Sequence, residues 1–336
     1  FMVVVLCGGG SAGHVLPNLG LIEYLSEKFP THQLAYIIEQ NGVEAGILKA
    51  YPNISLHPIY AGKIRRYLSV KNLLDLFKIP VGIIQSYLTL RRVKAKLVIS
   101  KGGYVSVPVI IAAYLLRIPV IHHESDASPS LTSKLACRLA SELWFQYEQA
   151  SLDHKNTYTI ELPMRRSIAQ ANKQDFTYYK YLDPNKKTLL VMGGSLGAKF
   201  LNDFVNQHLD LLLQQYNVIH LTGLKQPEVP KPKPSYVPLK FVSQIGSIYQ
   251  TADLFLGRAG ATTLSELAFY GLSSVLVPLP LNASRGEQFE NAQAFSKQYP
   301  ASVIMQSEFN LETFFSAIKE LSKQGGSKSQ KSNSTS

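Results

Sequence analysis

The sequence has little cysteine. Only two of its 336 residues are cysteines, Cys7 and Cys137, too few for a disulfide framework or a cysteine-rich zinc site. Both stand in apolar surroundings, which favours small buried side chains over a redox pair. We also expect no secretion signal, because the apolar run Val3–Cys7 has no basic stretch before it and stops at glycines. We therefore expect a protein of the reducing cytoplasm.

Charge is also scarce, but it is unbalanced. Charged residues make up 17% of the chain and hydrophobic residues 46%, which excludes a mainly disordered protein. Lys and Arg number 34 against 23 Asp and Glu, so the formal net charge is +11. This excess indicates an anionic partner, which can be nucleic acid, a phospholipid surface or a phosphorylated substrate. The length predicts two domains.

One apolar segment, residues 68–90, raises the question of a membrane. It contains Lys71, Asp75, Lys78 and Pro80, so it is not typical of a spanning helix. Two interpretations stay open: a helix packed in the core with a solvated basic edge, or an interfacial patch that meets anionic headgroups. The apolar candidates for the patch are Leu73, Leu76, Phe77, Ile83 and Ile84, and the flanking basic residues are Lys63, Arg65, Arg66, Arg91, Arg92, Lys94 and Lys96.

Short β-branched runs alternate with amphipathic helical stretches in two series. Such alternation predicts parallel strands with right-handed crossovers, so the expected fold class is α/β. The Pro- and Lys-rich run 225–238 is expected to be a surface loop, and the Ser-rich tail 325–336 to be disordered. The predicted strands are 2–6, 34–38, 55–59, 97–100 and 119–122 in the first series, and 188–192, 218–222, 239–242, 253–256 and 274–278 in the second.

Each series opens with a strand, a glycine loop and a helix. The loops are Gly8–Gly13 and Gly193–Gly197. This predicts two Rossmann-like halves, residues 1–163 and 164–324, facing a cleft in which the ligand binds.

The first glycine loop satisfies G-x-G-x-x-G, because its glycines permit a tight turn and the following helix favours an anion. Glu39 ends the next strand, where a dinucleotide-binding fold has the acidic residue that binds the ribose, so an NAD or FAD enzyme is one interpretation. His14 favours another. It stands in the first turn of the helix, where the helix dipole favours a neutral imidazole suited to general-base work. The alternative for His14 is a surface or capping histidine.

The segment Arg258–Glu266 follows a predicted strand and opens a helix. Thr263-x-x-Glu266 fits a capping box, which would explain both residues without a ligand. Alternatively, the helix N–H groups bind a diphosphate and Glu266 accepts hydrogen bonds from ribose hydroxyls. The loop Gly193–Gly197 is likewise either a tight turn or a phosphate-facing loop.

Six segments together resemble the MurG family of bacterial peptidoglycan glycosyltransferases. Those enzymes transfer GlcNAc from UDP-GlcNAc to lipid I, the undecaprenyl-diphosphate-linked muramyl-pentapeptide, and so form lipid II. The resemblance extends from the N-terminus to about Ser322. The segments are Gly9–His14, Lys101–Ser106, His123–Asp126, Gly193–Gly197, Arg258–Glu266, and Gln288 with Asn291.

The resemblance implies a GT-B fold and an inverting, metal-independent transfer of GlcNAc to the muramyl C4 hydroxyl, with His14 as the base and without a cofactor. It also implies a peripheral enzyme on the cytoplasmic face of the cell membrane, whose partners are UDP-GlcNAc, lipid I and the anionic inner leaflet but no nucleic acid. Tyr104 and Ser106 are the acceptor-side candidates. The implied UDP-GlcNAc-binding residues are Ser11, Ala12, Gly13, Asp126, Arg165, Ser195, Val242, Ala261, Thr262, Thr263, Leu264, Ser265, Glu266 and Gln288.

Several positions depart from the family's pattern. Ser11 stands where threonine is common and keeps the hydroxyl. Asp126 replaces an asparagine, so a possible donor becomes an acceptor, and Glu287 stands where Gln or Asp precedes the glutamine. At the domain junction the family has the pattern Gly-Asn-Pro-x-Arg. Residues 160–165, Ile-Glu-Leu-Pro-Met-Arg, match it only at Pro163 and Arg165.

Three alternatives to this function were weighed. An NAD or FAD enzyme leaves the second glycine loop and His14 without a role. Another GT-B enzyme with a lipid acceptor would share the donor half. A non-catalytic nucleotide-sugar-binding subunit is disfavoured because His14 and Glu266 are both retained.

Overall fold

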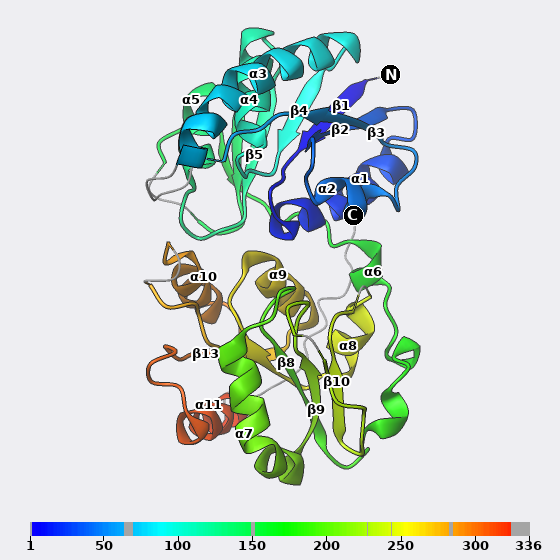
Figure 1. Cartoon of the computed structure of the whole chain (residues 1–336), viewed down its shortest axis with the longest axis vertical. Coiled ribbons are helices and arrows are strands. Elements are labelled where there is room, and N and C mark those ends of the chain that lie inside the picture. Colours follow the sequence, from blue (N-terminus) through cyan, green and yellow to red (C-terminus); the bar gives the residue numbers. More distant parts are fainter. Residues whose placement is uncertain are drawn as a thin grey trace. The chain divides into compact units, whose positions relative to one another are not determined.

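The structure is a computed structural model that describes residues 2–63, 70–148, 152–226, 228–242, 244–281 and 285–323, with the backbone alone at 70–74 and 76. The chain divides into two compact units, Phe1–Arg165 and Arg166–Ser336. Each unit is an α/β domain built on a parallel sheet, as predicted (Figure 1).

The described part of the first unit contains a seven-stranded sheet with the order β3-β2-β1-β4-β5-β6-β7. Its strands are β1 (Val3–Cys7), β2 (Gln33–Glu39), β3 (Ser55–Ile59), β4 (Leu97–Ser100), β5 (Val120–Glu124), β6 (Glu142–Phe145) and β7 (Thr157–Thr159). Its helices are α1 (Ala12–Lys28), α2 (Glu44–Leu48), α3 (Val70–Arg92), α4 (Ser106–Leu115) and α5 (Leu131–Leu139).

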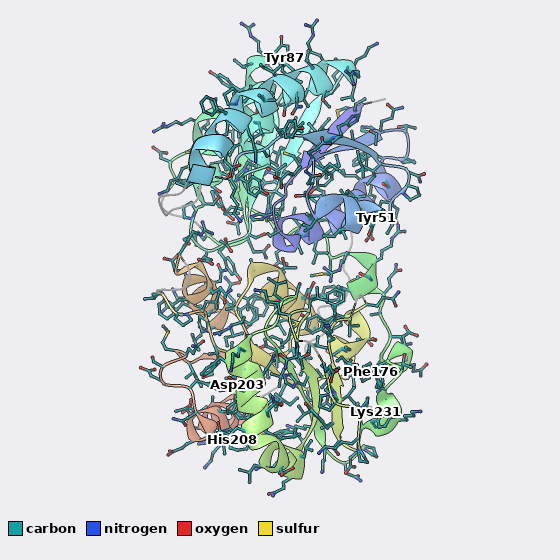
Figure 2. The ribbon with its side chains drawn as sticks, in the orientation of Figure 1. Tyr51, Tyr87, Phe176, Asp203, His208 and Lys231 are labelled. Carbon is teal, nitrogen blue, oxygen red and sulfur yellow. The ribbon has the colours of Figure 1, made fainter. Side chains whose placement is uncertain are left out.

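The side chains of β1 alternate between two cores, one on each face of the sheet. Val3, Val5 and Cys7 belong to a buried cluster with residues of α3, α4 and α5. Val4 and Leu6 belong to the cluster formed with α1 and α2. In Figure 2, Tyr87 marks the α3 layer, and Tyr51, whose hydroxyl donates to Glu23 of α1 at 2.5 Å, marks the other layer.

The described part of the second unit contains a six-stranded sheet with the order β10-β9-β8-β11-β12-β13. Helices α7 and α11 cover one face, where Phe204 packs edge-on against Phe309 and Phe314 at centroid distances of 4.8 and 5.7 Å. The strands are β8 (Lys187–Met192), β9 (Tyr216–Leu221), β10 (Tyr236–Leu239), β11 (Leu254–Gly257), β12 (Ser273–Leu276) and β13 (Ala301–Val303). The helices are α6 (Arg166–Ala169), the 3-10 turns η1 (Lys173–Asp175) and η2 (Tyr179–Tyr181), α7 (Lys199–Gln215), α8 (Gly246–Thr251), α9 (Ala261–Tyr270), α10 (Glu287–Ser296) and α11 (Leu311–Lys323).

The predicted strand 239–242 was wrong. The strand β10 spans Tyr236–Leu239 and overlaps the run that was predicted to be a loop. Because β10 is the edge strand of the described sheet and lies beside β9, its Pro238 removes no hydrogen bond from the interior of that sheet. The predicted disordered tail 325–336 lies outside the described residues.

Both sheets reverse their strand order next to their first strand, between β1 and β4 in the first unit and between β8 and β11 in the second. The chain leaves the two neighbouring strands in opposite directions at such a point, which opens a crevice at their carboxyl ends. The two glycine loops and the segments Lys101–Ser106 and Arg258–Gly260 all begin at these ends.

Candidate functional site

The first glycine loop interlocks with the loop between β4 and α4. Gly10 has φ +84°, and a β-carbon there would lie 2.2 Å from the ring of Tyr104. Gly103 has φ +77°, and a β-carbon there would lie 2.3 Å from the carbonyl oxygen of Gly9. Glycine is therefore required on both sides of this contact, and each loop holds the other in place.

A buried carboxylate of the protein occupies the first glycine loop. Glu44, at the start of α2, is fully buried, and its Oε1 accepts the Gly10 N–H at 2.6 Å. Within the described residues, its Oε2 has no hydrogen-bond partner. The N–H group that would face a pyrophosphate in a dinucleotide-binding loop is thus already bound to an anion.

Glu39, which stands where a dinucleotide-binding fold has its ribose-binding acidic residue, also has a partner within the protein. Glu39 accepts a hydrogen bond from the hydroxyl of Tyr104. Burial, together with this hydrogen bond to Glu39, raises the pKa of Tyr104. The Nζ of Lys63 lies 5.9 Å from the centroid of the Tyr104 ring. The acceptor-side candidate Tyr104 therefore lies between a carboxylate and an ammonium group.

His14 lies in the first turn of α1 and is half-buried. Its Nδ1 lies 2.8 Å from the Oγ of Ser11, the residue that precedes the helix. A β-carbon at Gly102 would lie 3.7 Å from the His14 ring, so the β4–α4 loop passes beside that ring. The structure thus brings together Ser11, Ala12, Gly13 and His14 at the carboxyl edge of the sheet, next to this loop.

Two buried residues of opposite charge lie below this edge, at the ends of β4 and β5. Lys101 and Glu124 are 3% and 7% exposed, and the Nζ of Lys101 donates to Ser125. Burial lowers the pKa of Lys101 to about 8, although Glu124 and Asp126 act in the opposite direction. Burial would raise the pKa of Glu124, but the charge of Lys101 and a hydrogen bond from Ser133 outweigh it and lower that pKa to about 2. Glu124 is therefore a carboxylate at neutral pH.

Glu124 also shapes the loop between β5 and α5. Its Oε1 accepts the N–H of Asp126 at 3.1 Å, and its Oε2 accepts the N–H of Ser130 at 3.1 Å. The loop therefore folds around one buried carboxylate, which positions the half-buried Asp126 near the surface.

Two other residues of the predicted site do not lie on the surface of these loops: Ser106 is buried beneath the β4–α4 loop, and Arg165 is the last residue of the first unit. Ser106 is fully buried, and its hydroxyl donates to the carbonyl oxygen of Gly102 at 2.8 Å, so it stabilises the β4–α4 loop from within. Arg165 is half-buried, and its backbone packs on Gly20 of α1, where a β-carbon would lie 2.9 Å from the Arg165 nitrogen. We leave Ser106 out of the proposed acceptor contacts.

In the second unit, the glycine loop between β8 and α7 presents an exposed Ser195. Gly194 has φ +88°, and no atom lies within 4 Å of the position of a β-carbon there. Gly197 packs on the end of β9, because a β-carbon there would lie 2.1 Å from the carbonyl oxygen of Thr222. One side of the loop is thus fixed by the sheet, and the other is open for a ligand.

Helix α9 begins beside this loop, at the end of β11. Its N-cap is Gly260, where no atom lies within 4 Å of a β-carbon position, so nothing obstructs the helix end. The capping-box interpretation was wrong, because Thr263 and Glu266 lie inside the helix and its cap has no side-chain hydrogen bond. Glu266 is 5% exposed, and the hydroxyl of Ser265 donates to the Ala261 carbonyl at 3.1 Å.

Arg258 fixes the strand ends behind α9. Its Nη1 donates to the carbonyl oxygens of Val277 and Pro278, both at 2.9 Å, and its Nη2 donates to Gln306 at 2.6 Å. Its guanidinium lies 6.0 Å from the ring centroid of Phe200. Arg258 is 8% exposed, and these hydrogen bonds hold the loops behind α9 together.

The remaining residues that were predicted to bind the donor lie near the same edge. The Oε1 of Gln288, on α10, accepts the N–H of Leu279 at 3.2 Å, and the buried Asn291 donates to the carbonyl of Ala259 at 3.5 Å. Val242 follows β10 and is half-buried beside the exposed Phe241.

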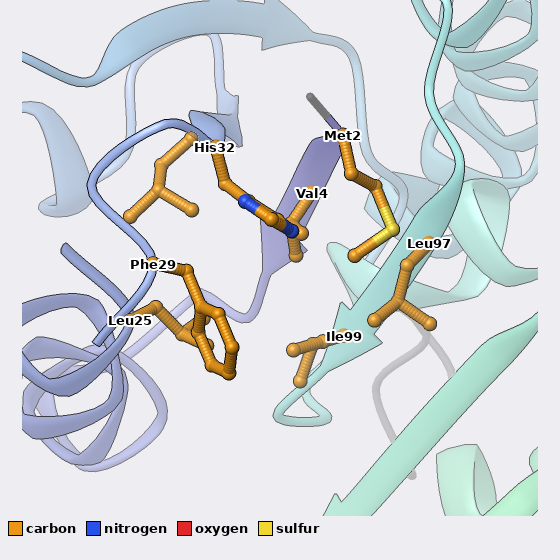
Figure 3. Close-up of a pocket in the computed structure, with 8 residues that line it drawn as sticks. Met2, Val4, Leu25, Phe29, His32, Leu97 and Ile99 are labelled. Atoms are coloured by element: carbon orange, nitrogen blue, oxygen red, sulfur yellow. The ribbon is translucent and has the colours of Figure 1, made fainter.

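The apolar pocket drawn in Figure 3 lies at the other edge of the first sheet. It has a volume of about 190 Å³, and its lining residues stand at the amino ends of the strands and at the end of α1. Parallel strands place this edge opposite the glycine loop, so the pocket is not part of the site. The lining residues are Met2, Val4, Leu25, Phe29, His32, Leu34, Leu97 and Ile99.

Helix α3 carries an exposed apolar stripe, which we call the α3 stripe: Phe77, Val81, Ile84 and Leu88. Their spacing of four, three and four residues places them on one face of the helix. Among the predicted patch residues, Phe77 and Ile84 are exposed and Ile83 is half-buried, whereas the side chains of Leu73 and Leu76 lie outside the described residues. In the described part of the chain, no helix is both long and apolar enough to span a bilayer.

Known families and structures match both units. The N-terminal domain of glycosyltransferase family 28 matches residues 4–144, and its C-terminal domain matches residues 188–336. A calicheamicin glycosyltransferase has the same fold, with 13% identity and a TM-score of 0.70 over 95% of this chain and 89% of its own. Two Rossmann-like units that match both domains of glycosyltransferase family 28 define a glycosyltransferase of the GT-B class.

More similar relatives narrow the class. A Clostridium novyi protein named UDP-N-acetylglucosamine–N-acetylmuramyl-(pentapeptide) pyrophosphoryl-undecaprenol N-acetylglucosamine transferase is 38% identical over 96% of this chain and 90% of its own length. A Staphylococcus aureus relative of the same name is 36% identical over 95% of this chain and 90% of its own. The crystal structure of Acinetobacter baumannii MurG has 26% identity and a TM-score of 0.73, covering 96% of this chain and 91% of its own. The chain belongs to the MurG family of glycosyltransferases.

Proposed function

We propose that this protein transfers GlcNAc from UDP-GlcNAc to the C4 hydroxyl of the muramyl sugar of lipid I, with inversion at the anomeric carbon. The observation that carries the proposal is the Ser11–His14 hydrogen bond at the first glycine loop, in a chain whose relatives are named for this transfer. It places an oriented imidazole at the switch point, where a sugar hydroxyl can reach it.

The hydrogen bond with Ser11 sets the chemistry of His14. A neutral imidazole has one protonated and one unprotonated nitrogen. When Nδ1–H donates to the Ser11 Oγ, Nε2 carries the lone pair and can accept the C4 hydroxyl proton. The C4 oxygen then attacks the anomeric carbon while the bond to the diphosphate oxygen breaks, and UDP leaves with the electron pair. In this arrangement the Ser11 hydroxyl oxygen accepts from Nδ1–H and leaves Nε2 as the basic nitrogen.

The donor belongs on the second unit. Ser195 and the start of α9, from Ala261 to Ser265, are placed to receive the diphosphate, because a helix N-terminus stabilises the charge that develops on the leaving group. Glu266, Val242 and Gln288 border the same edge and are assigned to the ribose, the uracil and the GlcNAc hydroxyls. Asp126 and Arg165 are assigned to the donor from the first unit.

Two contacts argue against a dinucleotide enzyme. The Gly10 N–H donates to Glu44, and Glu39 accepts a hydrogen bond from Tyr104. Both groups that would bind a dinucleotide are therefore already paired within the protein. The first loop instead serves to position His14.

The membrane contact is assigned to the α3 stripe. Its four apolar side chains are exposed along one face, and the exposed basic residues Lys78, Arg91 and Arg92 stand on the same helix. Apolar side chains that enter the headgroup region beside basic residues bind an anionic bilayer surface peripherally. A lipid-linked acceptor on the cytoplasmic face would meet the enzyme there.

Three experiments test this proposal. UDP-GlcNAc should raise the melting temperature and NADH should not; stabilisation by NADH alone would overturn the donor assignment. His14→Ala should lose turnover while it keeps its affinity for UDP, whereas unchanged turnover would remove His14 as the base. Ser11→Ala should lower kcat by about 10- to 100-fold, and Ser11→Thr, which keeps the hydroxyl, is the matched control.

A further inference from the structure

A line of buried polar groups crosses from β5 to β4 beneath the carboxyl edge of the first sheet. The Oγ of Ser133 donates to Glu124 Oε2 at 2.6 Å and lies 2.9 Å from His122 Nε2. His122 Nδ1 lies 3.0 Å from the Oγ of Ser100, which accepts the N–H of Gly102 at 3.3 Å. Ser100, His122 and Ser133 are at most 1% exposed.

The chemistry of the ends sets the direction of every hydrogen bond in this line. Glu124 is ionised and can only accept, so the single hydroxyl proton of Ser133 points to Glu124. Ser133 must then accept from His122, which places a proton on Nε2. In the neutral imidazole Nδ1 is then unprotonated and accepts the Ser100 hydroxyl, whose oxygen accepts the N–H of Gly102.

The line ends beside the proposed base. A β-carbon at Gly102 would lie 3.7 Å from the His122 ring and 3.7 Å from the His14 ring, so this glycine separates the two imidazoles. Gly102 has φ +83°, and its carbonyl oxygen accepts the hydroxyl of the buried Ser106. The backbone of Gly102, next to His14, is therefore held through both the N–H and the carbonyl group of this residue.

We propose that His122 is a positioning residue, fixed as the neutral Nε2–H tautomer, that connects the Glu124 carboxylate to Gly102 and so sets the β4–α4 loop beside His14. Its effect on catalysis rests on the proposed function, but its tautomer does not. An apolar side chain could fill the same space, but it would leave the buried hydroxyls of Ser100 and Ser133 without this partner. The titratable groups that act on His122 are Glu124, Lys101 and His14, and burial lowers the pKa of His122 to about 4.

The tautomer can be measured without substrate. In the full chain labelled with ¹⁵N-histidine at pH 7, His122 should show a protonated Nε2 and an unprotonated Nδ1 in long-range ¹H–¹⁵N spectra. Loss of the signal in His122→Gln assigns it. A protonated Nδ1, either as the other neutral tautomer or as an imidazolium, would overturn the proposal.

Kinetics test the positioning role. Ser133→Ala breaks the line, and its kcat for GlcNAc transfer should fall about 10-fold or more while KM for UDP-GlcNAc stays unchanged, because small displacements near a base slow the chemical step. Ser133→Thr, which keeps the hydroxyl, should recover most of the loss. Equal rates for Ser133→Ala and wild type would overturn the role.

The chain offers a matched histidine control. His154 is half-buried in the same unit, with Nε2 3.3 Å from the carbonyl of Ala140 and Nδ1 accepting the N–H of Asn156 at 3.2 Å, at the amino ends of the strands. His122→Gln should lower kcat as Ser133→Ala does, whereas His154→Gln should keep the wild-type kcat. Equal losses in the two histidine variants would identify a general folding effect and contradict positioning. If the wild type has the expected tautomer but no transferase activity, the proposed function fails and the tautomer assignment stands.

Discussion

The α3 stripe gives a prediction whose size can be worked from the structure. Phe77 and Ile84 are 69% and 60% exposed. Complete burial of such side chains is worth about 1.5–3 kcal/mol, so inserting their exposed parts into lipid is worth roughly 1–2 kcal/mol each. Replacing both with serine should therefore weaken membrane binding by about 2–4 kcal/mol, or roughly 30-fold to several hundred-fold.

The assay is co-sedimentation with vesicles that contain anionic phospholipid. Binding of wild type should weaken as salt rises, because the basic residues of the helix contribute through a screened attraction. Since both substituted residues are exposed, the free energy of unfolding should change by less than about 1 kcal/mol. Leu211→Ser, on the solvent side of α7 in the second unit, is the matched control and should bind like wild type. Unchanged binding of the double variant, or an equal loss in the control, would refute the assignment of the stripe.

Three further predictions concern the interior. In denaturant titrations, Gly103→Ala should lower the free energy of unfolding by about 2 kcal/mol or more, because its φ is +77° and the carbonyl of Gly9 stands where the β-carbon would be. Gly46→Ala, in α2 with open space around it, is the control and should be neutral or stabilising by up to about 1 kcal/mol. Equal effects of the two substitutions would contradict the interlocked loops. Burial lowers the pKa of His122 from 6.5 in the unfolded chain to about 4 in the folded protein, so between these values the unfolded chain binds the extra proton. The contribution of His122 to the free energy of unfolding is therefore present above pH 6.5 and is lost as the pH falls towards 4. In this window, the free energy of unfolding should decrease with falling pH less steeply in His122→Gln than in wild type, by up to about 1.4 kcal/mol per pH unit, whereas identical slopes would contradict a buried neutral imidazole. Glu266→Gln should weaken UDP-GlcNAc binding in calorimetry by about 10-fold, as expected for loss of one charged hydrogen-bond acceptor, and unchanged affinity would remove Glu266 from the ribose.

Local patterns were sufficient to predict the two glycine loops. Gly8–Gly13 and Gly193–Gly197 each follow a buried strand and precede a helix, and those neighbours are set within a few residues of chain. The α/β class followed from the same alternation. The capping box at Thr263 failed because its sequence spacing fits a helix start that the structure places three residues earlier, at Gly260.

Contacts between distant segments were not predictable in the same way. The Glu44–Gly10 hydrogen bond joins residues 34 positions apart, and the Ser100–His122 contact joins residues 22 positions apart on neighbouring strands. Their pairing depends on the order of strands in the sheet, which the residue pattern leaves open. The edge position of β10, which tolerates Pro238, is another consequence of that order.

The most direct test of the account is transfer of labelled GlcNAc from UDP-GlcNAc to a soluble lipid I analogue. The wild type should form the disaccharide product without added metal, and His14→Ala should form it at least about 100-fold more slowly, as expected for loss of a general base, while it still binds UDP. A folded protein that binds UDP-GlcNAc but makes no product with this acceptor, or a His14→Ala variant that works at the wild-type rate, would contradict the account.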